Sequence, residues 1–136
     1  PKMAERGSGT LLNIIGMAGR ANRAAYISGS SANAALIAFT QALGAEAQQQ
    51  GLRVFGINPS PTLTDRMTDF MKRKAAAELG DAARWHEMVE PDRFPYGRPA
   101  DPSEVAALAC MLVSPRVSYL NGTVVDIDGD GQWTGS

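Results

Sequence analysis

The sequence predicts an α/β fold in which helices cover a parallel sheet. Three short apolar segments, at 10–15, 52–58 and 122–128, have the length and composition of buried strands. Helical patterns and turn residues separate them, in the order strand, helix, strand, helices, helix, strand. Alternation at this spacing is typical of right-handed crossovers between parallel strands.

Each expected strand has a recognisable composition. The segment "TLLNII" at 10–15 is apolar almost throughout, as strands covered on both faces are. "LRVFGIN" at 52–58 has the same character and is ended by Pro59, because proline cannot continue the hydrogen-bond ladder. "GTVVDID" at 122–128 is rich in the β-branched residues that strands favour.

The helices are expected between these strands. From about Ser30 to Gln50 apolar residues recur at spacings of three and four, and Gly51 is a natural stop. The residues of this repeat are Ala32, Ala35, Leu36, Phe39, Ala42 and Leu43. Two short helices are expected within 65–90, divided at Gly80, with Asp81 capping the second.

A further helix begins with a strong start signal. Asp101 is expected to cap it, Pro102 to occupy its first position and Glu104 to reach back to the cap. Its expected buried stripe consists of Val105, Leu108, Ala109 and Leu112.

Size and composition limit the possible functions. The chain of 136 residues suits one domain, residues 1–136, with a modest core. A net charge of −1 provides no broad basic field for nucleic acid or anionic membrane, and no apolar run reaches the length of a membrane-spanning helix. One cysteine, Cys110, permits no internal disulfide, so we expect a cytoplasmic protein in which this thiol is buried and inert.

The sequence contains one arrangement that resembles a cation loop. In "DIDGDG" at 126–131, three aspartates and Gly131 occupy positions one, three, five and six of a calcium-loop pattern. A strand precedes them where that pattern has a helix, and position twelve lies past residue 136. We therefore expect no metal site here, and we expect Gly129 and Gly131 to turn the chain out of the sheet.

The order of the segments carries a family resemblance. "GTLLNIIGMAG", "NAALIAFTQALGAEAQQQGLRVFGINP", "PSPTLTDRM", "GRPADPSEVAALACMLVS" and "YLNGTVVDIDGDG" follow one another at the right separations. Together they resemble the C-terminal half of the short-chain dehydrogenase/reductase family, which implies a Rossmann-type, doubly wound, three-layer fold. The family's dinucleotide-binding glycine turn lies in its N-terminal half, which we expect to be absent from this sequence.

The resemblance implies an oxidoreductase that passes hydride between NAD or NADP and a carbonyl or alcohol carbon of a small molecule. Its residue that selects NAD or NADP follows the second strand of the missing half, so both cofactors stay open. In the family a tyrosine and a lysine four residues apart share one helix face, and a serine thirteen residues upstream contacts the same substrate oxygen. Free tyrosine is a poor base near neutral pH unless a cation lies beside it. Residues 3–71 contain no lysine.

Two alignments with the family are possible. Anchoring on "NAAL" puts Asn33 at the lysine place, Gly29 at the tyrosine place and Gly16 at the serine place. Anchoring on Tyr26 puts Ser30 and Asn13 at the lysine and serine places. We favour the first, because it needs no gap between the flanking strands. Tyr26 then lies one turn before the expected tyrosine, and is either the catalytic proton donor or an aromatic residue packed at the helix entry.

The cofactor loop resembles the family's P-G-x-x-x-T segment. Pro59 and Thr64 keep its spacing, Ser60 replaces its glycine, and Thr62 would lie over the nicotinamide. Alternatively, Thr64 only caps the next helix. Residues 65–95 correspond to the family's substrate-covering region, or else they only pack on the sheet.

The resemblance also implies a homo-oligomer, a dimer or tetramer, in which the alanine-rich face of the 30–50 helix pairs with its copy. The alternative function is a non-catalytic member of the family that binds a nucleotide or only assembles.

Overall fold

The computed structural model describes residues 2–21 and 24–130 and contains the expected parallel sheet. Its strands are β1 (Gly9–Ile14), β2 (Leu52–Pro59) and β3 (Thr123–Ile127). They lie in the order β1-β2-β3, and β2 pairs in parallel with both neighbours. The α/β fold class is therefore confirmed, with each strand within one or two residues of its predicted bounds.

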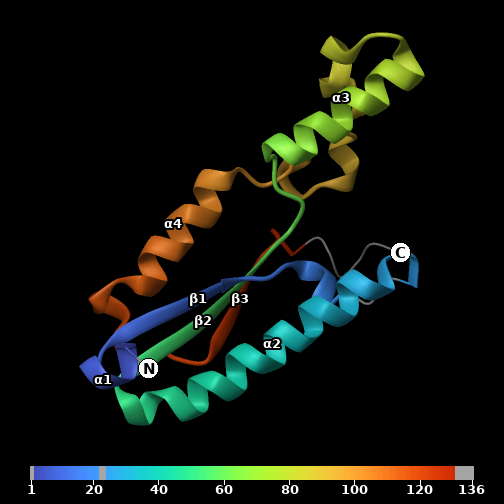
Figure 1. The fold of residues 1–136 in the computed structure, drawn as a ribbon. Coiled ribbons are helices and arrows are strands. Elements are labelled where there is room, and N and C mark those ends of the chain that lie inside the picture. Colours follow the sequence, from blue (N-terminus) through green and yellow to red (C-terminus); the bar gives the residue numbers. More distant parts are fainter. Residues whose placement is uncertain (1, 22–23, 131–136) are drawn as a thin grey trace.

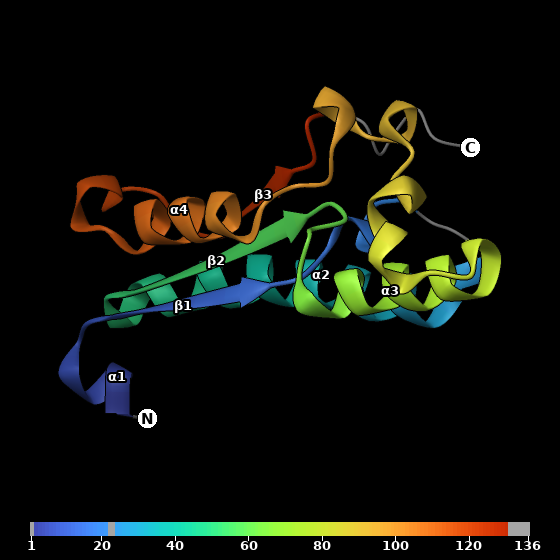
Figure 2. The ribbon, with the colours of Figure 1, turned by 90° about the horizontal axis from the view of Figure 1, so that it is seen from above.

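Helices cover both faces of this sheet. The long helix α2 (Ile27–Ala47) lies against one face and α4 (Pro102–Val113) against the other, which gives the three layers seen in Figures 1 and 2. One core cluster, on the α2 side, is built on Ala47, Leu52 and Val54. The other joins Phe55 and Ile57 of β2 to Leu112 of α4. The central strand β2 is thus buried from both sides, as its unbroken apolar composition predicts.

The buried face of α2 differs from the predicted stripe. Its buried residues are Ser30, Ile37, Thr40, Gly44 and Ala47. Leu36 and Phe39 are exposed, with 41% and 54% of their surface accessible. The prediction of a helix was right. Of the predicted repeat, Leu43 packs against the core, whereas Ala32, Ala35, Leu36, Phe39 and Ala42 are exposed.

The start of α4 is as predicted. Asp101 caps the helix and accepts a hydrogen bond from the Ser103 amide, while the Glu104 carboxylate accepts one from the Asp101 amide. The expectation for Cys110 was wrong: its side chain is exposed. The buried stripe of α4 passes through Leu108, Ala109 and Leu112, and residue 110 points away from it.

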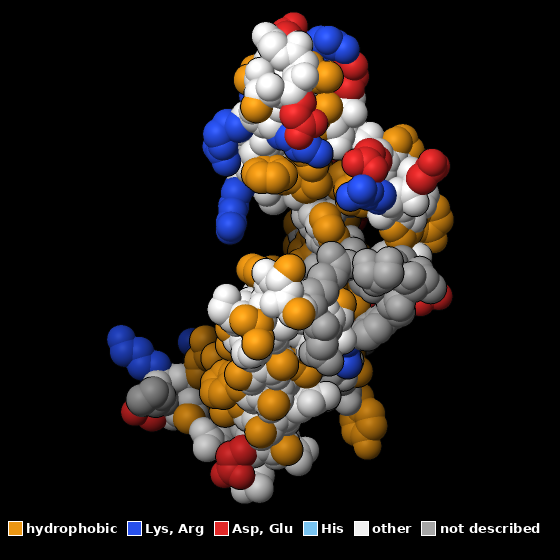
Figure 3. Space-filling view, turned by 90° about the vertical axis from the view of Figure 1, so that its right-hand side faces the viewer, with side chains coloured by type: hydrophobic (Ala, Val, Ile, Leu, Met, Phe, Trp, Pro, Cys, Tyr) orange, Lys and Arg blue, Asp and Glu red, His pale blue; other side chains and the backbone are white. Residues whose placement is uncertain are grey.

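The remaining elements form an arm and several short turns. Helix α3 (Asp65–Leu79) projects from the body, and the 3-10 turn η4 (Ala82–Met88) folds back beside it, begun by the predicted cap Asp81. In Figure 3 charged side chains gather on this arm, whereas hydrophobic ones predominate on the body below it. The other elements are α1 (Lys2–Arg6), η1 (Met17–Gly19), η2 (Ala24–Tyr26), η3 (Gln48–Gln50), η5 (Pro91–Arg93), η6 (Pro95–Gly97) and η7 (Pro115–Val117). Among the described residues, no helix combines the length and the apolar character needed to cross a membrane.

Candidate active site

A cavity of about 360 Å³ opens where β1 and β2 end. Ligands of open α/β sheets bind at this edge, outside the carboxyl ends of the strands. Its lining residues are Ile15, Gly16, Met17, Ala18, Ala21, Tyr26, Asn33, Pro59, Ser60 and Pro61. The cavity therefore joins the loop after β1, the first turns of α2 and the loop after β2, which are far apart in the sequence.

Tyr26 reaches this cavity through the space that Gly29 leaves empty. Tyr26 is the residue before α2, and its ring lies against the backbone of Gly29 one turn further on. A Cβ atom on Gly29 would overlap the Cε1 and Cζ atoms of the Tyr26 ring. The aromatic ring thus occupies the place where a side chain at position 29 would begin.

Gly16 and Asn33 lie next to each other in the lining of the same cavity. Gly16 has φ 151° and ψ 149°, a conformation that favours glycine. Its amide donates to Asn58 Oδ1 at 3.3 Å. Asn33 Nδ2 donates to the carbonyl oxygen of Gly29 at 2.7 Å, one turn back along α2. Because a carbonyl oxygen only accepts, this bond fixes which end of the Asn33 amide is nitrogen.

The geometry bears on the two alternative alignments. Gly16 and Asn33, the places assigned by "NAAL", both line the cavity. Asn13 lies within β1 and donates to Thr40 Oγ1 at 2.9 Å, and the buried Ser30 is likewise not among the lining residues. The lining thus contains Gly16 and Asn33, which the first alignment assigns to the serine and lysine places, together with Tyr26, on which the second alignment is anchored.

The predicted cofactor loop divides into two parts. Pro59 and Ser60 line the cavity, whereas Thr62 and Thr64 do not. The Thr62 hydroxyl donates to the Ser60 carbonyl oxygen at 2.8 Å and stiffens the turn. Thr64 is the N-cap of α3, and its hydroxyl oxygen accepts a long, 3.4 Å bond from the Met67 amide.

A polar network around the buried Asn58 supports the loop after β1. Asn58, fully buried at the end of β2, accepts from Gly16 and donates to Asp126 Oδ1 at 2.8 Å. Arg20 Nε donates to the same oxygen at 2.9 Å. Sequence reasoning missed this network, because its members come from three separate strands and loops and no local motif marks them.

Two aspartates of the segment that resembles a calcium loop, Asp126 and Asp128, accept hydrogen bonds from groups of the protein. Asp126 is engaged by Arg20 and Asn58, and Asp128 Oδ1 accepts from the Asp130 amide at 3.0 Å. Gly129 turns the chain with φ 61°, and Gly131 lies outside the described residues.

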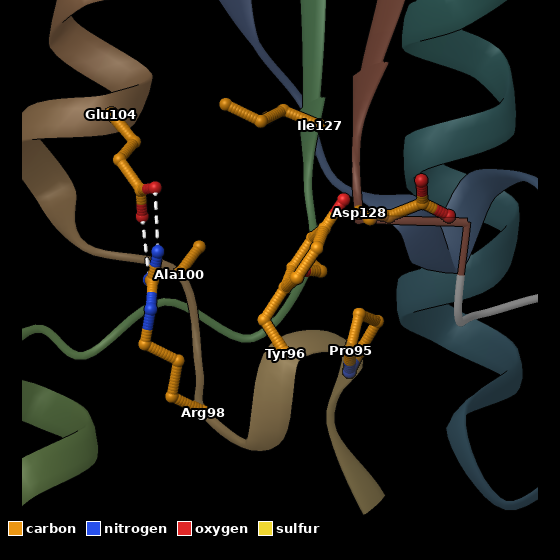
Figure 4. A pocket seen from close by; sticks show the side chains of 9 residues that line it. Pro95, Tyr96, Arg98, Ala100, Glu104, Ile127 and Asp128 are labelled. Carbon is orange, nitrogen blue, oxygen red and sulfur yellow. Dashed lines mark hydrogen bonds and ion pairs between the residues drawn. The ribbon is translucent and has the colours of Figure 1, made fainter.

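A second, smaller cavity of about 220 Å³ lies on the other side of β2 (Figure 4). Arg98 donates two hydrogen bonds across it to Glu104, at 2.8 and 2.9 Å. Hydrogen bonding by Arg98 and by the Asp101 amide lowers the pKa of Glu104 to about 2. The carboxylate of Asp128 points away from this space, and its Oδ2 atom has no hydrogen-bond partner among the described residues. The pair of charges therefore serves the start of α4.

Comparison with known proteins identifies the family. The family model described as enoyl-(acyl carrier protein) reductase matches residues 1–130. The chain is 36% identical over 129 residues to galactitol 2-dehydrogenase (L-tagatose-forming) of Cereibacter sphaeroides, an alignment that covers 93% of this chain and 47% of that protein.

Two solved structures support the same relation. The first is L-sorbose reductase of Gluconobacter frateurii, complexed with NADPH and L-sorbose. It matches with a TM-score of 0.87 and 27% identity, over 99% of this chain and 51% of that one. The second is a 3-oxoacyl-[acyl-carrier protein] reductase of Brucella melitensis with bound NAD. It matches with a TM-score of 0.70 and 25% identity, over 99% of this chain and 45% of that one. The chain thus spans about half the length of the relatives it matches.

Proposed function

Because the chain belongs to the short-chain dehydrogenase/reductase family, we propose that it forms the substrate-side half of an NAD(P)-dependent oxidoreductase in which Tyr26 is the proton donor. The observation that carries the proposal is the position of the Tyr26 ring. It lies on Gly29 and lines a cavity that Pro59 and Ser60 also line. The substrate is a small molecule with a carbonyl or alcohol carbon.

The residues of this cavity suit a nicotinamide ring. Ile15, Pro59 and Pro61 give apolar surface against which a flat ring can pack, and Ser60 adds a hydroxyl group. Relatives solved with NADPH and with NAD support either cofactor. When bound, the nicotinamide would supply the hydride. Pro59, Ser60 and Pro61 would hold its ring, and the hydrogen bond from the Thr62 hydroxyl to the Ser60 carbonyl oxygen keeps their turn in shape.

The role of Tyr26 follows from its surroundings. The lining residues that the structure describes include no lysine or arginine. A tyrosine hydroxyl can donate a hydrogen bond, and Tyr26 lines this cavity. We therefore assign the Tyr26 hydroxyl as a donor to the substrate carbonyl oxygen.

The test is reductase activity of the complete protein. We expect oxidation of NADH or NADPH in the presence of carbonyl compounds, followed by the absorbance of the reduced nicotinamide. Tyr26→Phe removes only the hydroxyl group and should lower kcat by about 100-fold or more, as loss of a positioned acid does. Tyr119→Phe is the matched control, because Tyr119 is fully exposed and belongs to a different cavity near the opposite ends of the strands. Equal activity of the Tyr26 and Tyr119 variants would refute the proposal.

A second candidate function is cofactor binding without turnover. It is favoured by Gly16, Gly29 and Asn33, which stand where the family has reactive side chains. Such a protein would be stabilised thermally by NAD(P)H, and no carbonyl compound would be reduced.

We also propose a homo-oligomer in a cytoplasmic, reducing compartment. The alanines at 32, 35 and 42 of α2 are exposed together with Leu36 and Phe39, which supports a helix surface that another copy covers. Sedimentation of the complete protein would give the oligomeric state, and a monomer at micromolar concentration would contradict it.

A further inference from the structure

A second cavity adjoins the one that Tyr26 lines, and the two share Ser60. This residue lines the cavity of about 360 Å³ and also the smaller one of about 220 Å³ shown in Figure 4. Both cavities lie at the carboxyl ends of strands, the first beyond β1 and β2 and the second beyond β2 and β3. Ligands of open α/β sheets bind along this edge. A ligand in the first cavity therefore has a second space beside it.

The smaller cavity has the size and the chemistry to receive one apolar ring. Its apolar lining residues are Pro95, Tyr96, Ala100 and Ile127. The charged residues Arg98 and Glu104 are bonded to each other at 2.8 and 2.9 Å. An apolar cavity of about 150 Å³ accommodates benzene, whereas cavities for whole ligands measure about 300–1,000 Å³. The space therefore suits one part of a larger ligand.

Tyr96 has a backbone conformation that disfavours its residue type. Its φ is 59° and its ψ is 17°, and the following Gly97 has φ 68°. Together with the bond from the Arg98 amide to the Pro95 carbonyl oxygen, two successive positive φ angles give the pattern of a type I′ turn. Asparagine, aspartate and glycine suit the first central position of this turn. The turn itself therefore does not explain why residue 96 is a tyrosine.

Packing does not explain Tyr96 either, because 87% of its surface is accessible. The turn nevertheless lies closely against the end of β3. A Cβ atom on Gly129 would lie 2.6 Å from the Pro95 Cβ and 3.2 Å from the Tyr96 Cε2. This glycine lets the turn approach, and Figure 4 shows the tyrosine ring between Pro95 and the Arg98–Glu104 pair. Disfavoured backbone conformations cluster at binding sites, so the ring at the cavity is best explained by a ligand.

From these observations we propose that the smaller cavity is a subsite for a flat apolar ring of the substrate, which packs on the face of Tyr96. The inference rests on the proposed function, since it assumes that the substrate carbonyl lies in the cavity that Tyr26 lines. The substrate class is a carbonyl compound that carries an aromatic ring on a short chain, and the chain passes Ser60. Packing of one aromatic ring on another contributes about two- to tenfold in affinity beyond apolar contact.

The experiment measures binding, so that it does not depend on turnover. Calorimetry on the complete protein, loaded with NAD⁺ or NADP⁺, gives the affinities for ketones that the oxidised cofactor cannot reduce. The probes are phenylacetone, 4-phenyl-2-butanone and 5-phenyl-2-pentanone, in which the chain between ring and carbonyl grows by one carbon at a time. Each is compared with its cyclohexyl analogue, which has a similar size and no flat face. We expect the wild type to prefer at least one phenyl ketone over its analogue by about fivefold.

Two substitutions separate the ring of Tyr96 from the turn that carries it. Tyr96→Phe keeps the ring and removes the hydroxyl group, so the preference for the phenyl ketone should remain. Tyr96→Asn removes the ring and places a favoured residue in the turn. This variant should bind the two ketones of each pair with equal affinity, while its Tm stays at or above that of the wild type. Retained stability with lost selectivity is the result expected of a side chain that serves the ligand.

Equal affinities of the wild type for the phenyl and cyclohexyl ketones, including the case in which none binds, would overturn the inference. A preference that Tyr96→Asn retains, or that Tyr96→Phe loses, would overturn it as well, because the ring would not be its cause. So would a marked fall in the Tm of Tyr96→Asn, because the ring would then serve the fold.

Turnover separates this inference from the proposed function. A protein that prefers the phenyl ketone through Tyr96 and shows no turnover would refute the proposed catalysis and leave the subsite in place. Turnover of carbonyl compounds without that preference would refute the subsite alone.

Discussion

Gly29 and Tyr26 form a complementary pair, in which the absence of one side chain makes room for another. The Tyr26 ring is 54% exposed, so burial contributes little to holding it. What fixes its position is contact with the bare backbone of Gly29. A side chain at position 29 and the Tyr26 ring in its present place exclude each other.

This exclusion predicts a coupling between the two positions. Gly→Ala inside a helix ordinarily stabilises by about 1 kcal/mol. Gly29→Ala should fail to give this gain, because the new Cβ overlaps the Tyr26 ring and displaces it. In a Tyr26→Ala background the same change should recover the gain, so a double-mutant cycle of unfolding free energies should show a coupling of about 1 kcal/mol or more. Additive effects of the two substitutions would mean that the ring does not depend on Gly29.

At the scale of elements, the start of α4 is held by polar groups close in the sequence. The Glu104 carboxylate accepts from the Asp101 amide at 2.7 Å and receives two bonds from Arg98. Arg98 precedes Pro99 and Ala100, and Ala100 pairs with the loop after β2: its amide donates to Pro61 and its carbonyl oxygen accepts from Leu63. The cap of α4 therefore also fixes the segment that pairs with the loop after β2.

The pKa of Glu104 predicts a pH dependence of stability. The pKa is about 2 in the folded protein, against an ordinary value of 4.5, so the carboxylate is stabilised by folding. Its contribution is fully present above about pH 4.5 and is lost as the pH falls toward 2. Glu104→Gln should lower the Tm at pH 7, and the difference from the wild type should shrink across that acidic range. Glu78→Gln is the control, because Glu78 is exposed and forms no ion pair among the described residues. A difference in Tm that stays constant down to pH 2 would contradict the assignment.

These elements show which parts of the structure could be predicted from the sequence. The start of α4 was predictable because Asp101, Pro102 and Glu104 form a local capping motif, and the strands because their composition is apolar and β-branched. The buried face of α2 was not, because alanine is frequent on several sides of this helix and the pattern of large residues was misleading. Of the predicted site residues, Tyr26, Pro59 and Ser60 line one cavity, while Thr62 and Thr64 are not in its lining, and their roles stay predictions. The relation between Tyr26 and Gly29 depends on an absent side chain, which no propensity reveals.

At the scale of the whole molecule, α2 and the start of β3 approach each other through two glycines. A Cβ atom on Gly44 would lie 2.5 Å from the Cα of Gly122. Asn121 ties the same region together: its Nδ2 donates to the Gly44 carbonyl oxygen at 2.8 Å, and its Oδ1 accepts from the Val54 amide at 2.7 Å. This contact connects the long helix, the central strand and the last strand, and so sets the distance between two layers.

The close approach predicts that Gly44→Ala reverses the usual sign of a helix substitution. Helix propensity alone would give a gain of about 1 kcal/mol in the free energy of unfolding. The added methyl group meets backbone atoms of Gly122, which cannot rotate aside, so α2 must move from the sheet at a cost of about 1–3 kcal/mol. Chemical denaturation should therefore show Gly44→Ala to be less stable than the wild type. Ala45→Gly, at the exposed neighbouring position, measures the propensity effect in the same helix and should cost about 1 kcal/mol. A stabilising Gly44→Ala would show that helix and sheet have freedom to separate, and that the contact does not hold the layers at this distance.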